Sequence, residues 1–515
     1  MTGIKTLRFR VSHITFSLLF TISLFIISNA LNLDRIAKWF PQGANTDFVG
    51  LTAFLIFGLC FFMAFFILFA HPWVIKPVAV IFIFLSGAAT YFISKYQIAI
   101  DRSMVVNSIN TDITEVTGLL SIHMLPYVFF LIVLPVLIVL RADITFQKVG
   151  RYLAASLALL VFTIAIGAGA LYLNYKSIHR AANVSHKYIL HTLVPANLIG
   201  SIVGVLHRSI GEYYDKNKQA IEITGRVSSQ DDLVVVLAIG ETSRQKNFSI
   251  YGYDRKNTNP VLSKETGLHI LNGKAEIGTT ILALLQILEK NDIKLTAITS
   301  KLGIDTACYV NYSLYGNCKA VGEIEVSNCG HGGKCYDEDV IPLLQKNLET
   351  YVSGYKFIIL HLGGGSHGPS YTDRYPPEFQ IFNPQCKDAD VVNQCTLEEL
   401  YNSYDNTILY VDHVLGKIIN KLDDSELPYT FIYLSDHGES LLENDRIFHG
   451  MPPGIPLPPE QAEIPLIVKS SVPISIVPQK EYRQQDVYDT VLDLLSIESE
   501  LVDKERSFIK KNIQQ

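Results

Sequence analysis

Three ionisable residues follow two apolar segments at positions that suit a metal site. Glu241 comes just after the apolar run at residues 233–239, and Asp436 and His437 come just after the run at residues 429–434. Continuous apolar runs of this length are typical of strands buried in a parallel sheet. Because the carboxyl ends of parallel strands meet at one edge, we expect the three side chains to lie close together. Two carboxylates and an imidazole are ligands that Zn²⁺ accepts.

A divalent cation at this edge would support phosphoryl transfer. It would lower the pKa of a hydroxyl group and stabilise negative charge on a phosphoryl oxygen, which are the two tasks of such a site. His367 and His449, in the same half of the chain, are expected to donate to a phosphate group or to hold a second ion. The alternative interpretation is that residues 435–440 (SDHGES) only end a strand.

Strands and helices alternate around these residues. A third apolar run, residues 355–361, leads into the glycine-rich segment GGGSHGP, and a helical pattern covers residues 397–422. This alternation predicts an α/β sandwich with a mainly parallel sheet. We therefore expect residues 232–515 to form the α/β domain that carries the site.

The first 174 residues have a different character. The chain is 49% hydrophobic and only 18% charged, and the apolar excess lies here, in segments that are long enough to cross a hydrocarbon core of about 30 Å. Five helices are predicted, at residues 12–31, 49–70, 74–93, 121–140 and 152–173. The first could instead be a cleaved signal peptide, but its length and the lack of a small-residue cleavage site favour an uncleaved anchor. Residues 175–231 are predicted to be a bridging helix and a linker.

Basic residues indicate the orientation of these helices. They precede the first span and occupy the second and fourth segments outside the membrane, at Lys5, Arg8, Arg10, Lys76, Arg141, Lys148 and Arg151. Such segments tend to be cytoplasmic, so five crossings would place the carboxyl-terminal domain outside. The prediction is a multi-pass protein of a bacterial inner membrane with a periplasmic domain.

The positions of the cysteines favour an oxidising compartment for the outer domain. Cys60 lies within a predicted span, and the other six fall into three neighbouring pairs in the outer domain: Cys308, Cys318, Cys329, Cys335, Cys386 and Cys395. None of them forms a CxxC pair, which favours disulfides over a zinc site. The sequence alone does not prove the pairing.

The outer loop near residues 96–120 carries Asn107, Thr111 and Glu115, which a helix would place on one face. That face suits a lipid headgroup, and a solvated amphipathic helix on the membrane surface is the alternative.

The net charge of −6 excludes a globally basic, nucleic-acid-binding character.

Four segments resemble the signature blocks of the bacterial lipid A phosphoethanolamine transferases. They are residues 240–253 (GETSRQKNFSIYGY), 365–376 (GSHGPSYTDRYP), 401–412 (YNSYDNTILYVD) and 435–450 (SDHGESLLENDRIFHG). The resemblance implies an inner-membrane enzyme with a periplasmic domain of the alkaline phosphatase and sulfatase superfamily. It implies that a threonine takes phosphoethanolamine from phosphatidylethanolamine, releases diacylglycerol and passes the group to lipid A or the lipopolysaccharide core. Weaker binding of cationic peptides such as polymyxin would follow.

The resemblance also assigns roles to single residues. It implies one zinc ion, or two, and a zinc-activated threonine beside Glu241, Asp436 and His437. His367 and His449 match histidines that assist at the phosphate or bind a second zinc ion. Contacts to the substrate are implied for Asn107, Thr111, Glu115 and Lys319.

The segment of the nucleophile departs from the family's pattern. The family carries a segment similar to CGTxT and a second cysteine, whereas residues 275–292 read AEIGTTILALLQILEKND. The number of residues between Glu241 and Thr280 is almost the number that separates the glutamate and the nucleophile in the family, so we take Thr280 as the nucleophile and as a zinc ligand. The alternative is that Thr279 only caps the next helix and that the domain is a catalytically degenerate membrane sensor. Another phosphotransferase or hydrolase of the superfamily, acting on a different periplasmic glycan, is a further alternative.

Overall fold

The chain folds into two compact units. The computed structural model describes residues 9–42, 45–110, 119–215, 223–311, 314–326, 335–363, 368–369 and 371–511. The first unit, here called the membrane unit, comprises residues 1–112 and 120–216. The second, here called the α/β unit, comprises residues 113–119 and 217–515.

The membrane unit contains five helical segments that are long and apolar enough to cross a membrane. They are α1 (His13–Ala30), α3 (Phe48–Ile67), α4 (Ile75–Tyr96), the segment Ile122–Arg141 and α9 (Val149–Leu173). The fourth segment is built from η1 (Ile122–Met124), α7 (Leu125–Tyr127), the π-helical η2 (Val128–Val133) and α8 (Leu134–Arg141). The prediction of five apolar helices is confirmed.

Side-chain caps explain where two of these helices begin. The Ser12 hydroxyl accepts a hydrogen bond from the Thr15 N–H at the start of α1, and the Asp47 carboxylate accepts one from the Gly50 N–H at the start of α3. Each cap satisfies a donor that the first turn of a helix leaves unpaired.

The residues that follow α9 pack on the membrane helices. They form α10 (Tyr175–Val184), η3 (Tyr188–His191) and α11 (Ala196–Asp215). Ile178, Ile189 and Leu193 are buried in one apolar core with residues of α1 and α3, such as Phe54. The remaining elements of this unit are α2 (Leu33–Lys38), α5 (Arg102–Asn110), the parallel pair β1 (Phe9–Ser12) and β4 (Ala142–Thr145), and the pair β2 (Pro41–Gln42) and β3 (Asn45–Thr46).

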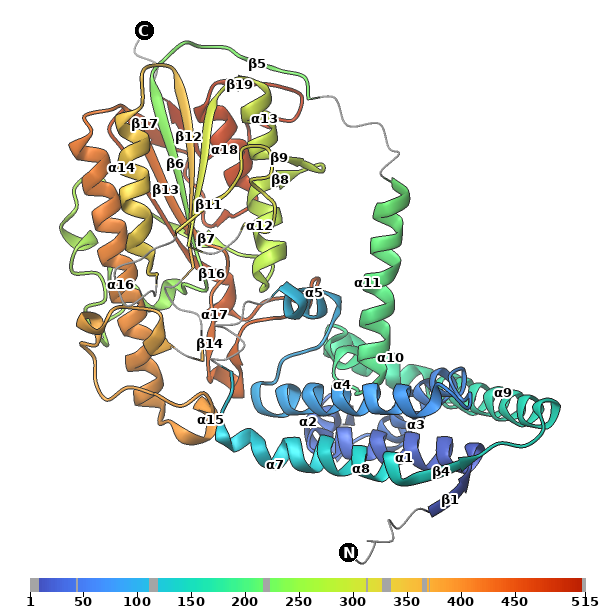
Figure 1. The fold of residues 1–515 in the computed structure, drawn as a ribbon. Coiled ribbons are helices and arrows are strands. Elements are labelled where there is room, and N and C mark those ends of the chain that lie inside the picture. Colours follow the sequence, from blue (N-terminus) through green and yellow to red (C-terminus); the bar gives the residue numbers. More distant parts are fainter. Residues whose placement is uncertain are drawn as a thin grey trace, which may run out of the picture. The chain divides into compact units, whose positions relative to one another are not determined.

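An eight-stranded sheet forms the centre of the described α/β unit (Figure 1). Its order is β11 (Ile324–Glu325), β10 (Asp305–Val310), β12 (Tyr355–Leu362), β6 (Leu233–Gly240), β13 (Tyr429–Ser435), β16 (Glu463–Ser470), β7 (His269–Lys274) and β18 (Tyr482–Arg483). Within the described sheet, β16 alone runs against the other strands. The predicted α/β sandwich with a mainly parallel sheet is confirmed.

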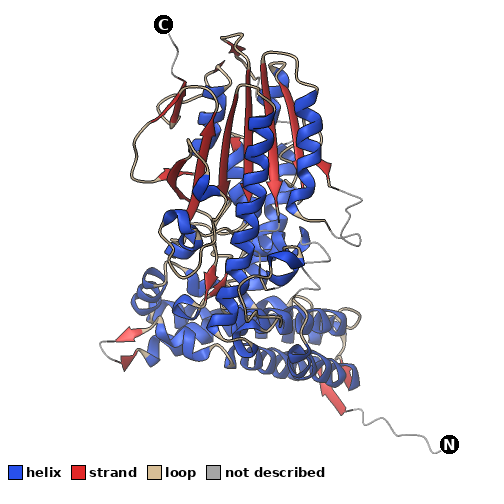
Figure 2. Cartoon of the chain, turned by 90° about the vertical axis from the view of Figure 1, so that its left-hand side faces the viewer, coloured by secondary structure: helices blue, strands red, loops and turns tan. Residues whose placement is uncertain are grey.

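Helices cover both faces of the sheet (Figures 1 and 2). On one face lie α12 (Thr280–Leu288), α13 (Leu295–Lys301) and α18 (Asp486–Leu494), and on the other lie α14 (Ile341–Glu349) and α16 (Leu397–Asp424). Val235 and Leu237 of β6 share a core with Leu284 of α12, and Val236, which lies between them in the strand, is buried as well. Burial from both sides explains why the strand reads as a continuous apolar run.

Short α-helices and strands also belong to the α/β unit. They are α15 (Val391–Gln394), α17 (Pro459–Ala462), β5 (Arg226–Val227), β8 (Glu289–Lys290), β9 (Ile293–Lys294), β14 (Ser440–Leu441), β15 (Ile447–Phe448), β17 (Ile474–Ile476), β19 (Ile497–Glu498) and β20 (Ile509–Lys511).

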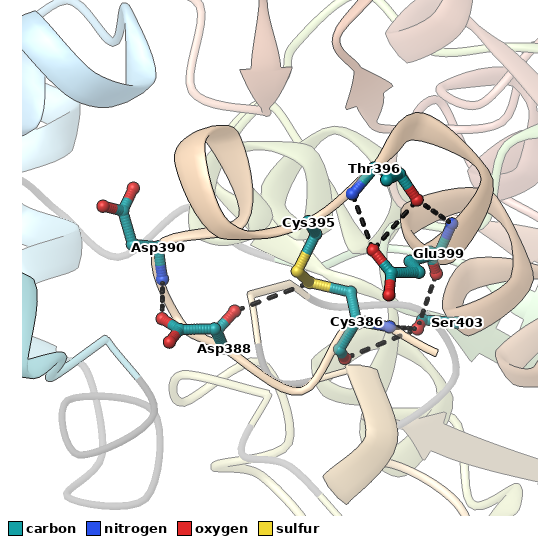
Figure 3. The surroundings of a disulfide bond; sticks show 7 residues. All are labelled: Cys386, Asp388, Asp390, Cys395, Thr396, Glu399 and Ser403. Atoms are coloured by element: carbon teal, nitrogen blue, oxygen red, sulfur yellow. Dashed lines mark hydrogen bonds between the residues drawn. A yellow bond between two sulfur atoms is a disulfide. The ribbon is translucent and has the colours of Figure 1, made fainter. Parts of the chain in front are cut away.

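Disulfides connect neighbouring cysteines in the α/β unit. Cys308 is bonded to Cys318, and Cys386 is bonded to Cys395. The second bond lies beside the start of α16, where the Cys386 N–H donates to the Ser403 hydroxyl at 2.8 Å (Figure 3). Cys335 is disulfide-bonded too, Cys329 lies outside the described residues, and Cys60 is a free, buried thiol in α3.

Candidate active site

The predicted metal-binding residues come together at the carboxyl ends of β6 and β13. These strands are parallel neighbours in which Ser435 pairs with Gly240, so Glu241 and Asp436 both leave the sheet at the same point. The Asp436 N–H donates to the Gly240 carbonyl at 3.0 Å, and the Thr242 N–H donates to Asp436 Oδ1 at 2.9 Å. The strand ends are therefore linked by backbone and side-chain hydrogen bonds beyond the sheet.

Thr280 is the first residue of α12 and faces this cluster. Its hydroxyl donates to Glu241 Oε1 at 3.0 Å and lies 3.5 Å from His437 Nε2. Thr279 occupies the capping position before it, but its side chain makes no capping hydrogen bond. The hydroxyl that reaches the carboxylate and the imidazole is thus that of Thr280.

The donor set fits a divalent cation. The His437 ring donates from Nδ1 to the Gly438 carbonyl at 3.0 Å, which leaves a lone pair on Nε2. This nitrogen faces Asp436 Oδ2 at 3.2 Å and Glu241 Oε1 at 3.9 Å, and Asp436 Oδ2 accepts no hydrogen bond within the described residues. Burial lowers the pKa of His437 to about 4, so the ring is neutral at pH 7. Buried lone pairs that face one another in this way suit a divalent cation.

His449 adds a second imidazole to the cluster. One ligand atom from each of Glu241, His437 and His449 lies within 4.8 Å of the other two, and the centroids of the two imidazole rings are 4.5 Å apart. Backbone contact explains this approach, because the Gly450 N–H donates to the Gly278 carbonyl at 2.8 Å. The segments of Thr280 and His449 are therefore joined.

Several supporting residues were not singled out from the sequence. Glu439 is fully buried and its carboxylate lies 3.6 Å from His449 Nδ1. Arg244 is also buried and forms a 2.6 Å ion pair with Glu443, and its guanidinium donates to the Glu439 carbonyl at 3.1 Å. These residues belong to the sequence blocks quoted above. Their place in those blocks was the only signal in the sequence that could have marked them as site residues.

Local backbone geometry also holds the cluster in place. Thr242 has a φ of 50°, which is rare for a branched residue and typical of functional sites. Its carbonyl accepts a hydrogen bond from the buried Tyr404 hydroxyl at 2.9 Å. A side chain on Gly438 would fall on the Glu460 carbonyl, so the turn after His437 requires glycine.

The other predicted site residues lie elsewhere in the chain. Asn107 is partly buried on α5 of the membrane unit, and Lys319 is exposed in the turn after Cys318. His367, Thr111 and Glu115 lie outside the described residues.

Known proteins resemble the chain in both units. The family "Phosphoethanolamine transferase EptA/EptB" matches residues 58–210, and the family "Sulfatase" matches residues 277–497. The chain is 31% identical to phosphoethanolamine transferase EptA of Escherichia coli (strain K12) over 479 residues, which cover 83% of this chain and 84% of that protein. It is 32% identical to the EptA of Helicobacter pylori over 433 residues, which cover 80% of each chain.

A solved structure shares the fold over nearly the whole chain. The integral membrane lipooligosaccharide phosphoethanolamine transferase A (EptA) from Neisseria meningitidis matches with a TM-score of 0.82 and 24% identity, covering 97% of this chain and 98% of that chain. This likeness shows the fold, and the identity to the two curated relatives shows the family. The chain belongs to the EptA family of phosphoethanolamine transferases and is a membrane protein.

Proposed function

We propose that the protein transfers phosphoethanolamine from phosphatidylethanolamine to lipid A, or to the lipopolysaccharide core, through a covalent intermediate on Thr280. The contact of the Thr280 hydroxyl with Glu241 and His437 at the start of α12 is the observation that carries this proposal. Names of relatives support the substrates. They include "Phosphatidylethanolamine transferase Mcr-1" of Escherichia coli, 25% identical, and "Kdo(2)-lipid A phosphoethanolamine 7''-transferase" of Salmonella typhimurium, 24% identical.

The reaction has two displacement steps at phosphorus. In the first, Thr280 Oγ1 gives up its proton and forms a bond to the phosphorus of the donor lipid. The bond from phosphorus to the diacylglycerol oxygen breaks, and that oxygen takes up a proton as diacylglycerol leaves. In the second, an oxygen of the acceptor attacks the same phosphorus, the bond to Thr280 Oγ1 breaks, and Oγ1 takes up the proton that the acceptor oxygen gives up. The unpaired N–H groups at the start of α12 favour the negative charge held there.

Zinc is the proposed cofactor. Glu241, Thr280, Asp436 and His437 would hold one ion, which when bound lowers the pKa of the threonine hydroxyl and stabilises charge on the phosphoryl oxygen. His449 and His367 contact the phosphate group or hold a second zinc ion. The lone pair on His437 Nε2 and the buried carboxylates support the first of these sites.

Substrate contacts and location complete the proposal. Asn107, Thr111 and Glu115 contact the donor headgroup, and Lys319 lies near the substrate. Residues 1–174 form the transmembrane domain in the bacterial inner membrane, and residues 232–515 form the periplasmic catalytic domain. Residues 175–231 form a bridging helix and a linker between them. The disulfides of the α/β unit support an oxidising compartment. The added amine lowers the binding of polymyxin to the cell surface.

The experiment measures the intact mass of lipid A and core from cells that lack their own phosphoethanolamine transferases. The cells express the wild-type protein, Thr280→Ala or Thr279→Ala, and immunoblots confirm equal membrane levels. We expect the mass of one added phosphoethanolamine group with the wild type and with Thr279→Ala, and below about 1% of that product with Thr280→Ala.

Two outcomes would contradict the proposal. Loss with Thr279→Ala alone would move the nucleophile by one residue. A wild-type protein that reaches the membrane but never changes the mass of lipid A or core would exclude these acceptors.

A further inference from the structure

An apolar groove lies between two helices of the membrane unit. It has a volume of about 330 Å³, within the range of about 300–1,000 Å³ of small-molecule sites. Among the described residues that line it, Ser23 supplies the only polar side chain. The lining residues are Phe9, Val11, Phe16, Leu19, Phe20, Ser23, Leu24 and Ile27 on one side, Phe130, Leu134, Pro135, Ile138 and Val139 on the other, and Ile83 of α4.

Helix packing explains why the groove is open. Both α1 and α8 pack on α4, which leaves Ile83 between them. The π-helical segment η2 and Pro135 in the first turn of α8 interrupt the regular helix on the side of the groove. Leu19 and Ile138 remain about half exposed, at 59% and 51%, on opposite walls.

The depth of the groove matches one leaflet of a membrane. Its lining on α1 runs from Phe16 to Ile27, a length of about 16 Å at a rise of 1.5 Å per residue. Half of a hydrocarbon core is about 15 Å thick. In a membrane-spanning helix pair, an extended acyl chain is the ligand that fits an apolar groove of this depth.

Basic residues surround the end of the groove at Phe9 and Val11. Arg10 lies between them on β1, Arg141 ends α8, and the Lys76 ammonium donates to the Leu140 carbonyl at 3.3 Å. Asp143 is the acidic neighbour among the described residues of this region and lies 3.7 Å from the Arg10 guanidinium. This excess of cations over carboxylates favours an anionic headgroup.

We infer that this groove binds a phospholipid with an anionic headgroup, with one acyl chain between α1 and α8 and its phosphate at Arg10, Lys76 and Arg141. The site differs from the proposed donor contacts. Lys76 lies in the first turn of α4, whereas Asn107 follows the far end of that helix, and 22 helical residues span about 33 Å. The bound lipid therefore belongs to the leaflet at the opposite end of α4 from the loop that carries Asn107.

The test uses the full-length protein in mild detergent and native mass spectrometry with equal amounts of phosphatidylglycerol and phosphatidylethanolamine. Ser23→Trp and Ile138→Trp fill the groove from its two walls. Ile22→Trp and Leu137→Trp are matched controls, because these exposed neighbours do not line it. The charge is tested with Arg10→Gln combined with Arg141→Gln, against Arg151→Gln at the start of α9.

We expect phosphatidylglycerol to remain bound to the wild type, beside any phosphatidylethanolamine that the proposed donor site retains. The occupancy of phosphatidylglycerol should fall about tenfold or more in the groove variants and in the double arginine variant, and should stay unchanged in the controls. Phosphoethanolamine transfer by the groove variants shows that they are folded. Unchanged occupancy of phosphatidylglycerol in both groove variants, or an equal loss of phosphatidylethanolamine from them, would overturn the inference. A protein dimer that only the groove variants dissociate would also overturn it, because a second copy would then cover the groove.

Discussion

Thr279 and Thr280 are chemically identical neighbours with different surroundings. The Thr280 hydroxyl contacts Glu241 and His437, whereas the Thr279 hydroxyl is buried without a hydrogen-bond partner among the described residues. A buried polar group without a partner costs free energy that an apolar group of the same shape does not. The two side chains therefore differ in the described structure: the Thr280 hydroxyl is paired, and the Thr279 hydroxyl is not.

We predict that Thr279→Val raises the free energy of unfolding by about 1 kcal/mol, because it removes the unsatisfied hydroxyl and keeps the branched shape. Thermal unfolding of the purified protein in detergent checks this. The control is Thr280→Val, which removes a paired hydroxyl and should not stabilise. A lower melting temperature for Thr279→Val than for the wild type would show that its hydroxyl is paired in solution.

Asp412 predicts a pH dependence of stability. This buried carboxylate on α16 accepts hydrogen bonds from the N–H groups of Val261 at 2.8 Å and Leu262 at 2.9 Å, and burial raises its pKa to about 6. The folded state therefore binds the proton more tightly than the unfolded chain, so the contribution of Asp412 to stability falls as pH rises from about 4 to about 6.

We expect Asp412→Asn to remove this dependence. The difference in unfolding free energy between wild type and variant should change by about 2–3 kcal/mol between pH 4 and pH 7, in the direction that favours the wild type at low pH. Chemical unfolding at a series of pH values measures it. Parallel curves for the two proteins would show that the pKa of Asp412 is not raised.

At the scale of elements, the site depends on two segments that meet after the strands end. The turn after β13 contacts the segment before β16, where the Gly438 N–H donates to the Gln461 carbonyl at 2.8 Å. A Cβ on Gly438 would fall on the Glu460 carbonyl and would also crowd the Arg244 side chain. The backbone approach of these two segments sets the position of His437.

We therefore predict that Gly438→Ala lowers phosphoethanolamine transfer at least about tenfold, because the turn must move and displace the His437 ring by a fraction of an ångström. Lipid A mass spectra and zinc content of the purified protein are the measurements. Gly200→Ala on α11 is the matched control, since no described atom lies within 4 Å of its added Cβ. Full activity of Gly438→Ala would mean that the turn relaxes without moving the site.

At the scale of the whole molecule, the candidate metal site exists only in the folded α/β unit. Glu241, Thr280, His437 and His449 are separated by up to about 200 residues in the sequence and meet because β6, β13 and α12 pack together. A ligand that binds the folded state alone stabilises it by mass action.

Zinc is accordingly expected to raise the unfolding temperature, and a strong chelator to lower it. At a free concentration of about 100 times the dissociation constant, the stabilisation is about 2.7 kcal/mol. Differential scanning calorimetry of the full chain with and without chelator measures the effect, and Glu241→Gln should abolish most of it. An equal response of wild type and Glu241→Gln would place the stabilising ion elsewhere.

Features that depend on neighbouring residues were predictable from the sequence. The five apolar helices follow from runs that match the thickness of a membrane, and β6, β12 and β13 follow from runs that are buried on both faces. The direction of the parallel strands then implied that Glu241, Asp436 and His437 would meet at one edge. Motif blocks indicated the family, and motif spacing favoured Thr280 over Thr279.

Only the tertiary structure decided the contacts between distant segments. The 4.8 Å grouping of His449 with Glu241 and His437, the reversed strand β16 and the pairing of Arg244 with Glu443 leave no periodic signal in the sequence. The direction in which each threonine hydroxyl at the start of α12 points was also decided only by the tertiary structure, because the two residues are of the same type and are neighbours in the chain. Hydrophobic periodicity reports burial along the chain, whereas the site depends on which buried segments lie next to one another.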